Sequence, residues 1–212
     1  MATPEVETTT DTSPTAATER HDRGWRPYRL SVRQYLKMIA AGVFPPETHA
    51  ELLGGILVQP MTKGDSHNYT LLAFPIVLRD IIPQEWLVAE EISLRLGPKS
   101  RPEPDVMVLQ GPVPRYKGQP PTPQDVALVV EVAESSYRYD RGHKWKRYAA
   151  AQIPVYWIIN IKKRQIEVYR DPAGIEVNAE YRTAEVYGED GTVPVLIAGA
   201  EVGRVAVRDI LP

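Results

Sequence analysis

The stretch from Asp125 to Val132 reads DVALVVEV, and it constrains the fold more than any other part of the chain. Every residue between its two acids is apolar. A strand with one buried face alternates apolar and polar residues, whereas a strand covered on both faces is apolar almost throughout. The pattern therefore predicts a central strand with further layers packed on both of its sides.

A second buried strand is expected at 154–159, followed by an alternating strand at 164–169 that pairs with it as a hairpin. Between the two buried strands, Asp140 is a candidate cap for a helix from Arg141 to about Gln152. Helices and strands thus alternate in groups along the chain. This order predicts an α/β or α+β fold with a mixed β-sheet flanked by helices.

The remaining expected elements follow from caps, turn residues and apolar periodicity. Ser31 and Gln34 form a capping-box pattern that opens a short helix, and Pro75 is expected to kink a helix that begins at Ser66 and runs to about Ile82. The others are a hairpin at 51–58 around Gly54-Gly55, strands at 86–96 and 104–109, a surface loop after Gly111, and short strands near 183–187, 193–196 and 204–207.

Domain organisation is simple. Residues 1–24 are polar and contain too little apolar surface to offset their ordering entropy, so we expect a disordered N-terminal tail. Residues 25–212 are expected to form a single domain, with a core at about 29–170 and C-terminal strands, including an added β-hairpin region, at 171–212.

Composition excludes several classes of protein. The chain has no Cys, which rules out disulfide scaffolds, thiolate metal sites and cysteine nucleophiles. No apolar run reaches the ~18 residues of a membrane span, and the N-terminus is polar, so we expect a cytoplasmic protein with no membrane segment. The net charge of −2 comes from the tail, because residues 21–212 sum to +1. Net charge therefore says little about partners.

Glu131 is the residue of the apolar strand that most needs an explanation. An unpaired carboxylate in a buried strand is costly, or it takes up a proton. A metal ion or a lysine would compensate for its burial. The alternative is that Glu131 lies at the end of the strand in water, or pairs with an arginine.

Asp105 opens the strand that follows Pro104, and it could converge with Glu131 near one edge of the same sheet. Two carboxylates at such a distance are best tolerated when they share a divalent cation. Mg²⁺ takes one or two carboxylates and completes its octahedron with waters and phosphate oxygens. Taken alone, Asp105 is better interpreted as a turn-forming residue after proline.

Lys144 lies one turn into the helix expected after Asp140, and could point its ammonium at a metal-bound water. Alternatively, Lys144 forms an ordinary surface pair with Asp140 four residues earlier. The order of Pro104-Asp105, an apolar strand with Glu131, and a nearby lysine is that of PD-(D/E)xK nucleases. In those enzymes the acids hold the metal, and the lysine orients the attacking water and stabilises developing charge.

The segment from Val129 to Lys144 resembles the Uma-two (Uma2) family of restriction-endonuclease-like proteins, and the likeness spans about 29–170. The residues that carry it are Pro104-Asp105, VVEVAESSYRYDRGHK at 129–144, Tyr148-Ala149, Ile153-Pro154, Tyr156-Trp157-Ile158-Ile159, Glu167-Val168-Tyr169, Glu51-Leu52-Leu53-Gly54-Gly55, Met61 and His67. The resemblance implies an α-β-β-β-α-β core, a divalent-metal site and phosphodiester cleavage.

The resemblance also implies roles for individual residues. Asp105 and Glu131 match the metal-binding acids. Lys144 matches a lysine that in this family has moved from the strand to the following helix. In the general PD-(D/E)xK pattern the lysine lies two residues after the strand acid, where this chain has Ala133. Glu51 matches an acid that could reach the metal through water; a solvent-facing residue is the alternative. His67 matches a position near substrate, but a surface histidine is an equal interpretation.

We therefore expect a Mg²⁺- or Mn²⁺-dependent endonuclease acting on DNA, with Asp105, Glu131, Lys144 and Glu51 as catalytic residues. The alternative is an inactive nuclease-fold module that binds nucleic acid or a protein. A glycosidase acid pair fits less well, because only 8% of residues are aromatic and Lys144 would have no role. The chain could also form a homodimer. The candidate nucleic-acid contacts are His67, Arg138, Arg141, Lys144, Lys146 and Arg147, with Lys162, Lys163 and Arg164 nearby in sequence and Arg95, Lys99 and Arg101 as additions at the rim.

Overall fold

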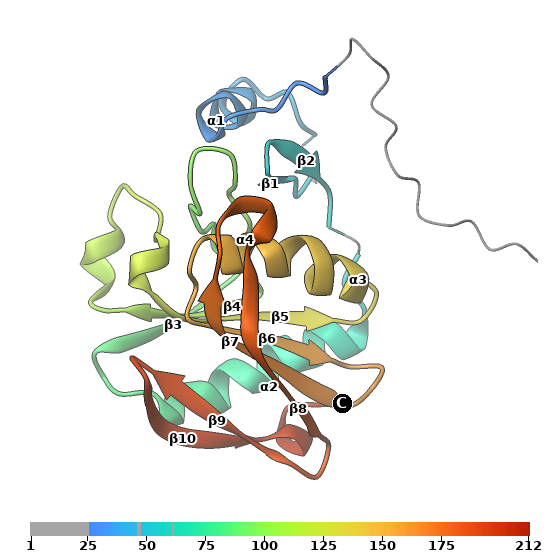
Figure 1. The fold of residues 1–212 in the computed structure, drawn as a ribbon, viewed down its shortest axis with the longest axis vertical. Coiled ribbons are helices and arrows are strands. Elements are labelled where there is room, and N and C mark those ends of the chain that lie inside the picture. Colours follow the sequence, from blue (N-terminus) through green and yellow to red (C-terminus); the bar gives the residue numbers. More distant parts are fainter. Residues whose placement is uncertain (1–25, 46–47, 61) are drawn as a thin grey trace, which may run out of the picture.

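The computed structural model describes residues 26–45, 48–60 and 62–212, so the expected disordered tail lies outside the described residues. Its centre is a six-stranded sheet in the order β3-β4-β5-β6-β7-β8 (Figure 1). These strands span Trp86–Glu90, Val106–Gln110, Val126–Ala133, Val155–Asn160, Gln165–Ala173 and Glu180–Gly188. The expectation of a mixed sheet flanked by helices is confirmed.

Strand direction follows from the connections. β5 and β6 are parallel, and the other neighbouring pairs of this sheet are antiparallel. A parallel pair needs a long crossover, and the helical segment at 137–150 supplies it. β6 and β7 form the expected hairpin, in which Trp157 pairs with Val168.

Both faces of the sheet are covered, as the apolar sequence of β5 predicts. All eight residues of β5 are buried, and successive side chains enter different cores. Val130 packs with Phe74 and Leu78 of α2 (Asp65–Ile81), on the face that also contacts β9 (Thr192–Ile197) and β10 (Ala200–Ala206). Val129 packs with Tyr148 of α4 (Trp145–Ala150) on the opposite face. β9 and β10 form the added C-terminal hairpin.

A smaller layer lies at one end of the molecule, where Figure 1 places α1 above the β1–β2 hairpin. α1 spans Val32–Ala40 and has the expected capping box between Ser31 and Gln34. β1 (Glu51–Leu53) and β2 (Ile56–Val58) form the expected hairpin. Its Leu52 packs with α1 in a small core of its own.

The helical crossover begins earlier than predicted and is not a uniform α-helix. α3 covers Tyr137–Tyr139, a π-helical turn covers Asp140–Lys144, and α4 follows directly. Asp140 is therefore inside the helical segment and does not cap its start. Its carboxylate accepts a hydrogen bond from the Ser136 hydroxyl at 2.6 Å. The prediction failed because a short helix before Asp140 leaves little periodicity to detect.

The start of α2, the end of β3 and the loop after Gly111 also differ from expectation. Gly64, not Ser66, precedes the first turn of α2, and the helix continues through Pro75. β3 stops at Glu90 rather than at residue 96, because Glu91 adopts a left-handed backbone conformation with φ 52°. The loop after Gly111 contains short 3-10 turns at Val113–Tyr116 and Pro123–Asp125.

Candidate active site

Three of the predicted site residues meet in the interior between the helical crossover and the sheet. Glu51 comes from β1, Glu131 from β5 and Lys144 from the π-helical turn. The Lys144 ammonium Nζ lies 2.9 Å from Glu131 Oε2 and 3.4 Å from Glu51 Oε1. All three side chains are buried, although 93 residues separate Glu51 from Lys144. The fold thus brings together an amine and two acids from three separate elements.

Glu131 is compensated by a lysine and a tyrosine, so it is neither at a wet strand end nor paired with an arginine. It lies in mid-strand, and its second carboxylate oxygen, Oε1, accepts a hydrogen bond from the Tyr148 hydroxyl at 2.6 Å. Burial raises the pKa of Glu131 well above its usual value, while the Lys144 charge opposes that shift. Glu131 is therefore held in place by two hydrogen bonds, but the burial of its negative charge still costs free energy.

Lys144 does not form the alternative surface pair with Asp140; its hydrogen bonds go to Glu131 and Glu51. Burial alone would lower the pKa of Lys144, but the surrounding carboxylates outweigh burial and raise it well above its usual value. Lys144 therefore stays charged at neutral pH. It is suited to stabilising negative charge rather than to accepting a proton.

Asp105 lies just before β4 and is anchored to the residue that follows Glu131. Its Oδ2 accepts a hydrogen bond of 2.8 Å from the backbone N–H of Val132 and lies 3.4 Å from His67 Nε2. Its Oδ1 accepts a 3.1 Å bond from Lys63 Nζ. Burial tends to raise the pKa of Asp105, but the bond from His67 and the charges of Lys144 and Lys63 together lower it to about 2. This acid is ionised at neutral pH.

His67 and Lys63 differ from what the sequence suggests. His67 is buried against Asp105 rather than lying on the surface, and its Nδ1 is buried with no hydrogen-bond partner among the described residues. Lys63 bridges Asp105 and Glu91, and no pattern in the sequence singles it out. Its position one residue before the Gly64 that opens α2 becomes informative only once α2 is placed beside the sheet.

The donor set suits a hard cation held by few protein ligands. Among the described residues, no three Asp, Glu or His side chains form a ready-made cage. The buried Glu51 Oε2 has no hydrogen-bond partner within the same described residues and keeps its lone pairs free. Mg²⁺ usually takes only one or two carboxylates and retains waters. Carboxylates outnumber ammonium groups in this cluster, so the residues fit a divalent ion.

The helical crossover also carries Arg141, Lys146 and Arg147, which are predicted to contact nucleic acid. The half-buried Arg141 packs its guanidinium carbon 5.2 Å from the Trp145 ring centre and 4.7 Å from that of Tyr169. Lys146 is exposed and donates a 3.1 Å hydrogen bond to the backbone of Val177.

Arg147 is exposed, and its guanidinium lies directly over Gly54 in the β1–β2 turn, so that a Cβ atom at Gly54 would displace it. We call Glu51, Asp105, Glu131 and Lys144 together the acidic cluster. Of His67, Arg141, Lys146 and Arg147, only His67 reaches this cluster, through its contact with Asp105.

The element order α2-β3-β4-β5-helix-β6, with two acids at β4 and β5, defines a restriction-endonuclease-like nuclease fold. The family model Uma2, described as "Putative restriction endonuclease", matches residues 32–205. The chain therefore belongs to the Uma2 family.

A solved structure agrees with this assignment at the level of the fold. It is the crystal structure of a nuclease, described as putative and belonging to DUF820, from Anabaena variabilis. It shares 18% sequence identity and superposes with a TM-score of 0.61, covering 85% of this chain and 97% of that chain. No curated protein matches the chain. In the ranges that the structure describes, no helix is long and apolar enough to cross a bilayer.

Proposed function

We propose that this protein is a divalent-metal-dependent endonuclease that hydrolyses phosphodiester bonds, with DNA as its substrate. The observation that carries the proposal is the buried contact of Lys144 with Glu131 and Glu51, beside an Asp105 whose pKa is lowered to about 2. Membership in a family described as restriction endonucleases supports the reaction class. Proteins of this class generally use a divalent metal ion, and Mg²⁺ or Mn²⁺ is the ion we propose.

Asp105 and Glu131 would hold the ion, and Glu51 would reach it through water. When bound, such an ion lowers the pKa of a coordinated water and neutralises charge on the attacked phosphate. The Val132 N–H and Lys63 keep the Asp105 carboxylate oriented, and the Tyr148 hydroxyl does the same for Glu131. Residues of this kind fix the geometry of the ligands they contact.

Lys144 has a different role, because its ammonium group is a permanent charge at neutral pH. A fixed cation in a site shielded from water stabilises the negative charge that develops on the phosphate during attack. Glu131 and Glu51 hold the ammonium in place from two sides.

The decisive experiment is nicking of supercoiled plasmid with Mg²⁺ or Mn²⁺ by the wild type and by Lys144→Met. We expect the variant to lose a factor of about 10² or more in rate, as is typical for removing a charge-stabilising group. Lys144→Met leaves two buried carboxylates without their cation, so its melting temperature should fall. The assay is therefore run at a temperature where circular dichroism shows both proteins folded.

Lys117→Met is the matched control, because Lys117 is an exposed lysine in the loop after β4. It should cleave at the wild-type rate. Turnover by Lys144→Met at that same rate would remove Lys144 from the mechanism. No cleavage by the wild type with either ion would favour the alternative, a nuclease-fold module without turnover.

A further inference from the structure

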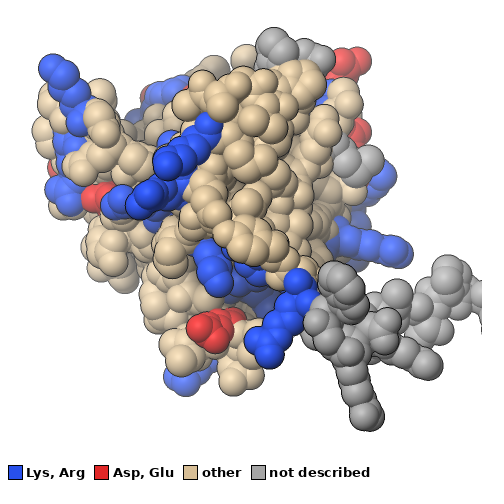
Figure 2. Space-filling view, turned by 90° about the horizontal axis from the view of Figure 1, so that it is seen from above, with Lys and Arg blue, Asp and Glu red and all other residues tan. Residues whose placement is uncertain are grey.

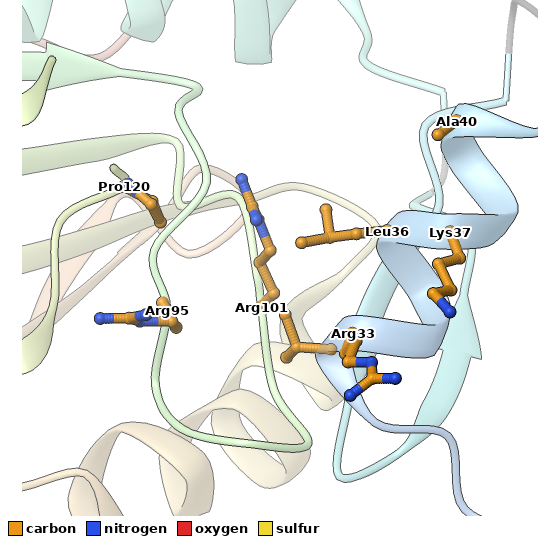
Figure 3. A pocket seen from close by; sticks show the side chains of 8 residues that line it. Arg33, Leu36, Lys37, Ala40, Arg95, Arg101 and Pro120 are labelled. Carbon is orange, nitrogen blue, oxygen red and sulfur yellow. The ribbon is translucent and has the colours of Figure 1, made fainter. Parts of the chain in front are cut away.

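A cleft of about 460 Å³ lies outside the acidic cluster, between α1 and the loop formed by residues 92–102. Figure 3 shows Leu36 of α1 reaching across it toward Arg101, with Arg95 and Pro120 on the opposite wall. Arg33 and Lys37 line it from α1. The cleft thus combines an apolar floor with four cationic side chains at its edges.

Positive charge is concentrated on the two segments that form this cleft. Residues 26–45 contain four Lys or Arg and no acid, and residues 92–102 contain three and no acid. Together they carry +7, whereas residues 26–212 as a whole sum to only +1. Figure 2 shows the end of the molecule that bears α1, where Lys and Arg side chains outnumber acidic ones. Such segregation of charge creates a local positive field on a nearly neutral protein.

The cations of the cleft also stand apart in their pairing. In the part of the chain that the structure describes, the side chains of Arg33, Lys37, Arg95 and Arg101 form no ion pair, whereas many arginines elsewhere do. The paired ones are Arg79, Arg115, Arg141, Arg164, Arg170, Arg204 and Arg208. The four cleft cations are therefore available to an anionic ligand.

Backbone hydrogen bonds join the two walls of the cleft to each other and to β1, the strand that carries Glu51. The N–H of Val32 donates to the carbonyl of Pro98 at 2.8 Å, which ties α1 to the loop. The N–H of Arg101 donates to the carbonyl of Leu52 at 2.6 Å, next to Glu51 in β1. A ligand in the cleft would therefore be held in a fixed relation to Glu51 and Lys144.

We propose that this cleft binds the sugar-phosphate backbone of the nucleic acid that the acidic cluster cleaves. The inference rests on the proposed nuclease function and adds a binding site for its substrate. Arg33, Lys37, Arg95 and Arg101 contact phosphates, and the apolar floor at Leu36 packs against sugar. Unpaired positive charge beside an apolar surface suits a polyanion that must extend beyond the scissile bond.

The test measures binding of a fluorescein-labelled DNA oligonucleotide by anisotropy at several salt concentrations, with EDTA present so that nothing is cleaved. The variant Arg33→Ala/Lys37→Ala removes two exposed cations one turn apart on α1. We expect at least tenfold weaker binding, and a slope of log K against log salt that is smaller by about 2, because each phosphate contact contributes about 0.9. Arg95→Ala should add to the loss.

The matched control is Arg204→Ala/Arg208→Ala, which removes two exposed arginines in and after β10, at the end of the molecule opposite α1 (Figure 1). It should change affinity less than twofold. Unchanged affinity and slope in Arg33→Ala/Lys37→Ala would overturn the proposal, as would stronger competition by a polyglutamate peptide than by unlabelled DNA.

Binding without cleavage separates the two proposals. If the wild type binds DNA through these cations but never cleaves with Mg²⁺ or Mn²⁺, the cleft stands and the endonuclease proposal fails. If the wild type cleaves and the α1 variant binds and cleaves equally well, the nuclease proposal stands and the cleft assignment fails.

Discussion

Asp140 is a buried acid in the π-helical turn, and among the described residues it has no cationic hydrogen-bond partner. Burial raises its pKa to about 6, although the Lys144 charge and the hydrogen bond from Ser136 act in the other direction. The folded protein therefore favours the neutral form of this side chain. Its stabilising contribution is complete below the ordinary value of 3.8 and is lost as the pH rises through about 6.

Asp140→Asn should remove this pH dependence, because the amide is neutral throughout. A shift from 3.8 to about 6 corresponds to roughly 3 kcal/mol in the free energy of unfolding. Between pH 4 and pH 7, the wild type should lose about 2–3 kcal/mol relative to the variant, as measured by urea unfolding at each pH. Asp209→Asn, at an exposed acid, should track the wild type. A wild-type-to-variant difference that does not change with pH would contradict this account.

At the scale of elements, α1 is a short helix whose stability depends on its cap. It has 9 residues, and its small core contains few side chains besides Val32, Tyr35 and Leu52. Helices this short are marginal without support. The Ser31 hydroxyl accepts from the Gln34 N–H at 3.2 Å, and the Gln34 side chain accepts from the Ser31 N–H at 2.9 Å.

Ser31→Ala should destabilise α1 by about 1 kcal/mol, the usual effect of losing an N-cap. Hydrogen exchange of α1 amides should then be about fivefold faster, while the amides of β5 stay as protected as before. Ser66→Ala is the matched control, because Gly64 and not Ser66 occupies the cap of α2. Equal exchange in α1 of both variants would show that the capping box does not hold this helix.

Elements with a continuous apolar signal could be predicted from the sequence, and those set by tertiary packing could not. β5 and β6 were predicted because both of their faces are buried. The π-helical turn was not predicted, because hydrogen bonds from residue i to residue i+5 leave no distinct pattern in the sequence. This turn nevertheless carries Lys144 to its contact with Glu131. His67 and Lys63 approach Asp105 only once α2 lies beside the sheet, which local sequence does not reveal.

At the scale of the whole molecule, Glu131 and Lys144 lie on one side of the sheet. One face carries α2 and the β9–β10 hairpin around the larger core, whereas the acidic cluster lies on the side of the helical crossover. The α1 and β1–β2 layer then closes over that cluster and contributes Glu51 to it. Each face of the sheet thus has its own apolar core, and the excess of carboxylates over cations lies on the side of the helical crossover.

This arrangement predicts that the folded protein gains stability from a divalent cation. An ion at about 100 times its Kd that binds only the native state adds about 2.7 kcal/mol, which for a chain of this length raises the melting temperature by roughly 5–10 °C. We expect such a shift with Mn²⁺ for the wild type and for Asp209→Ala, and none for Asp105→Ala. Because burial raises the pKa of Glu131, a proton competes with the ion there, so the shift should shrink as the pH falls. A melting temperature that Mn²⁺ leaves unchanged at every pH would favour an inert module over a metal-dependent enzyme.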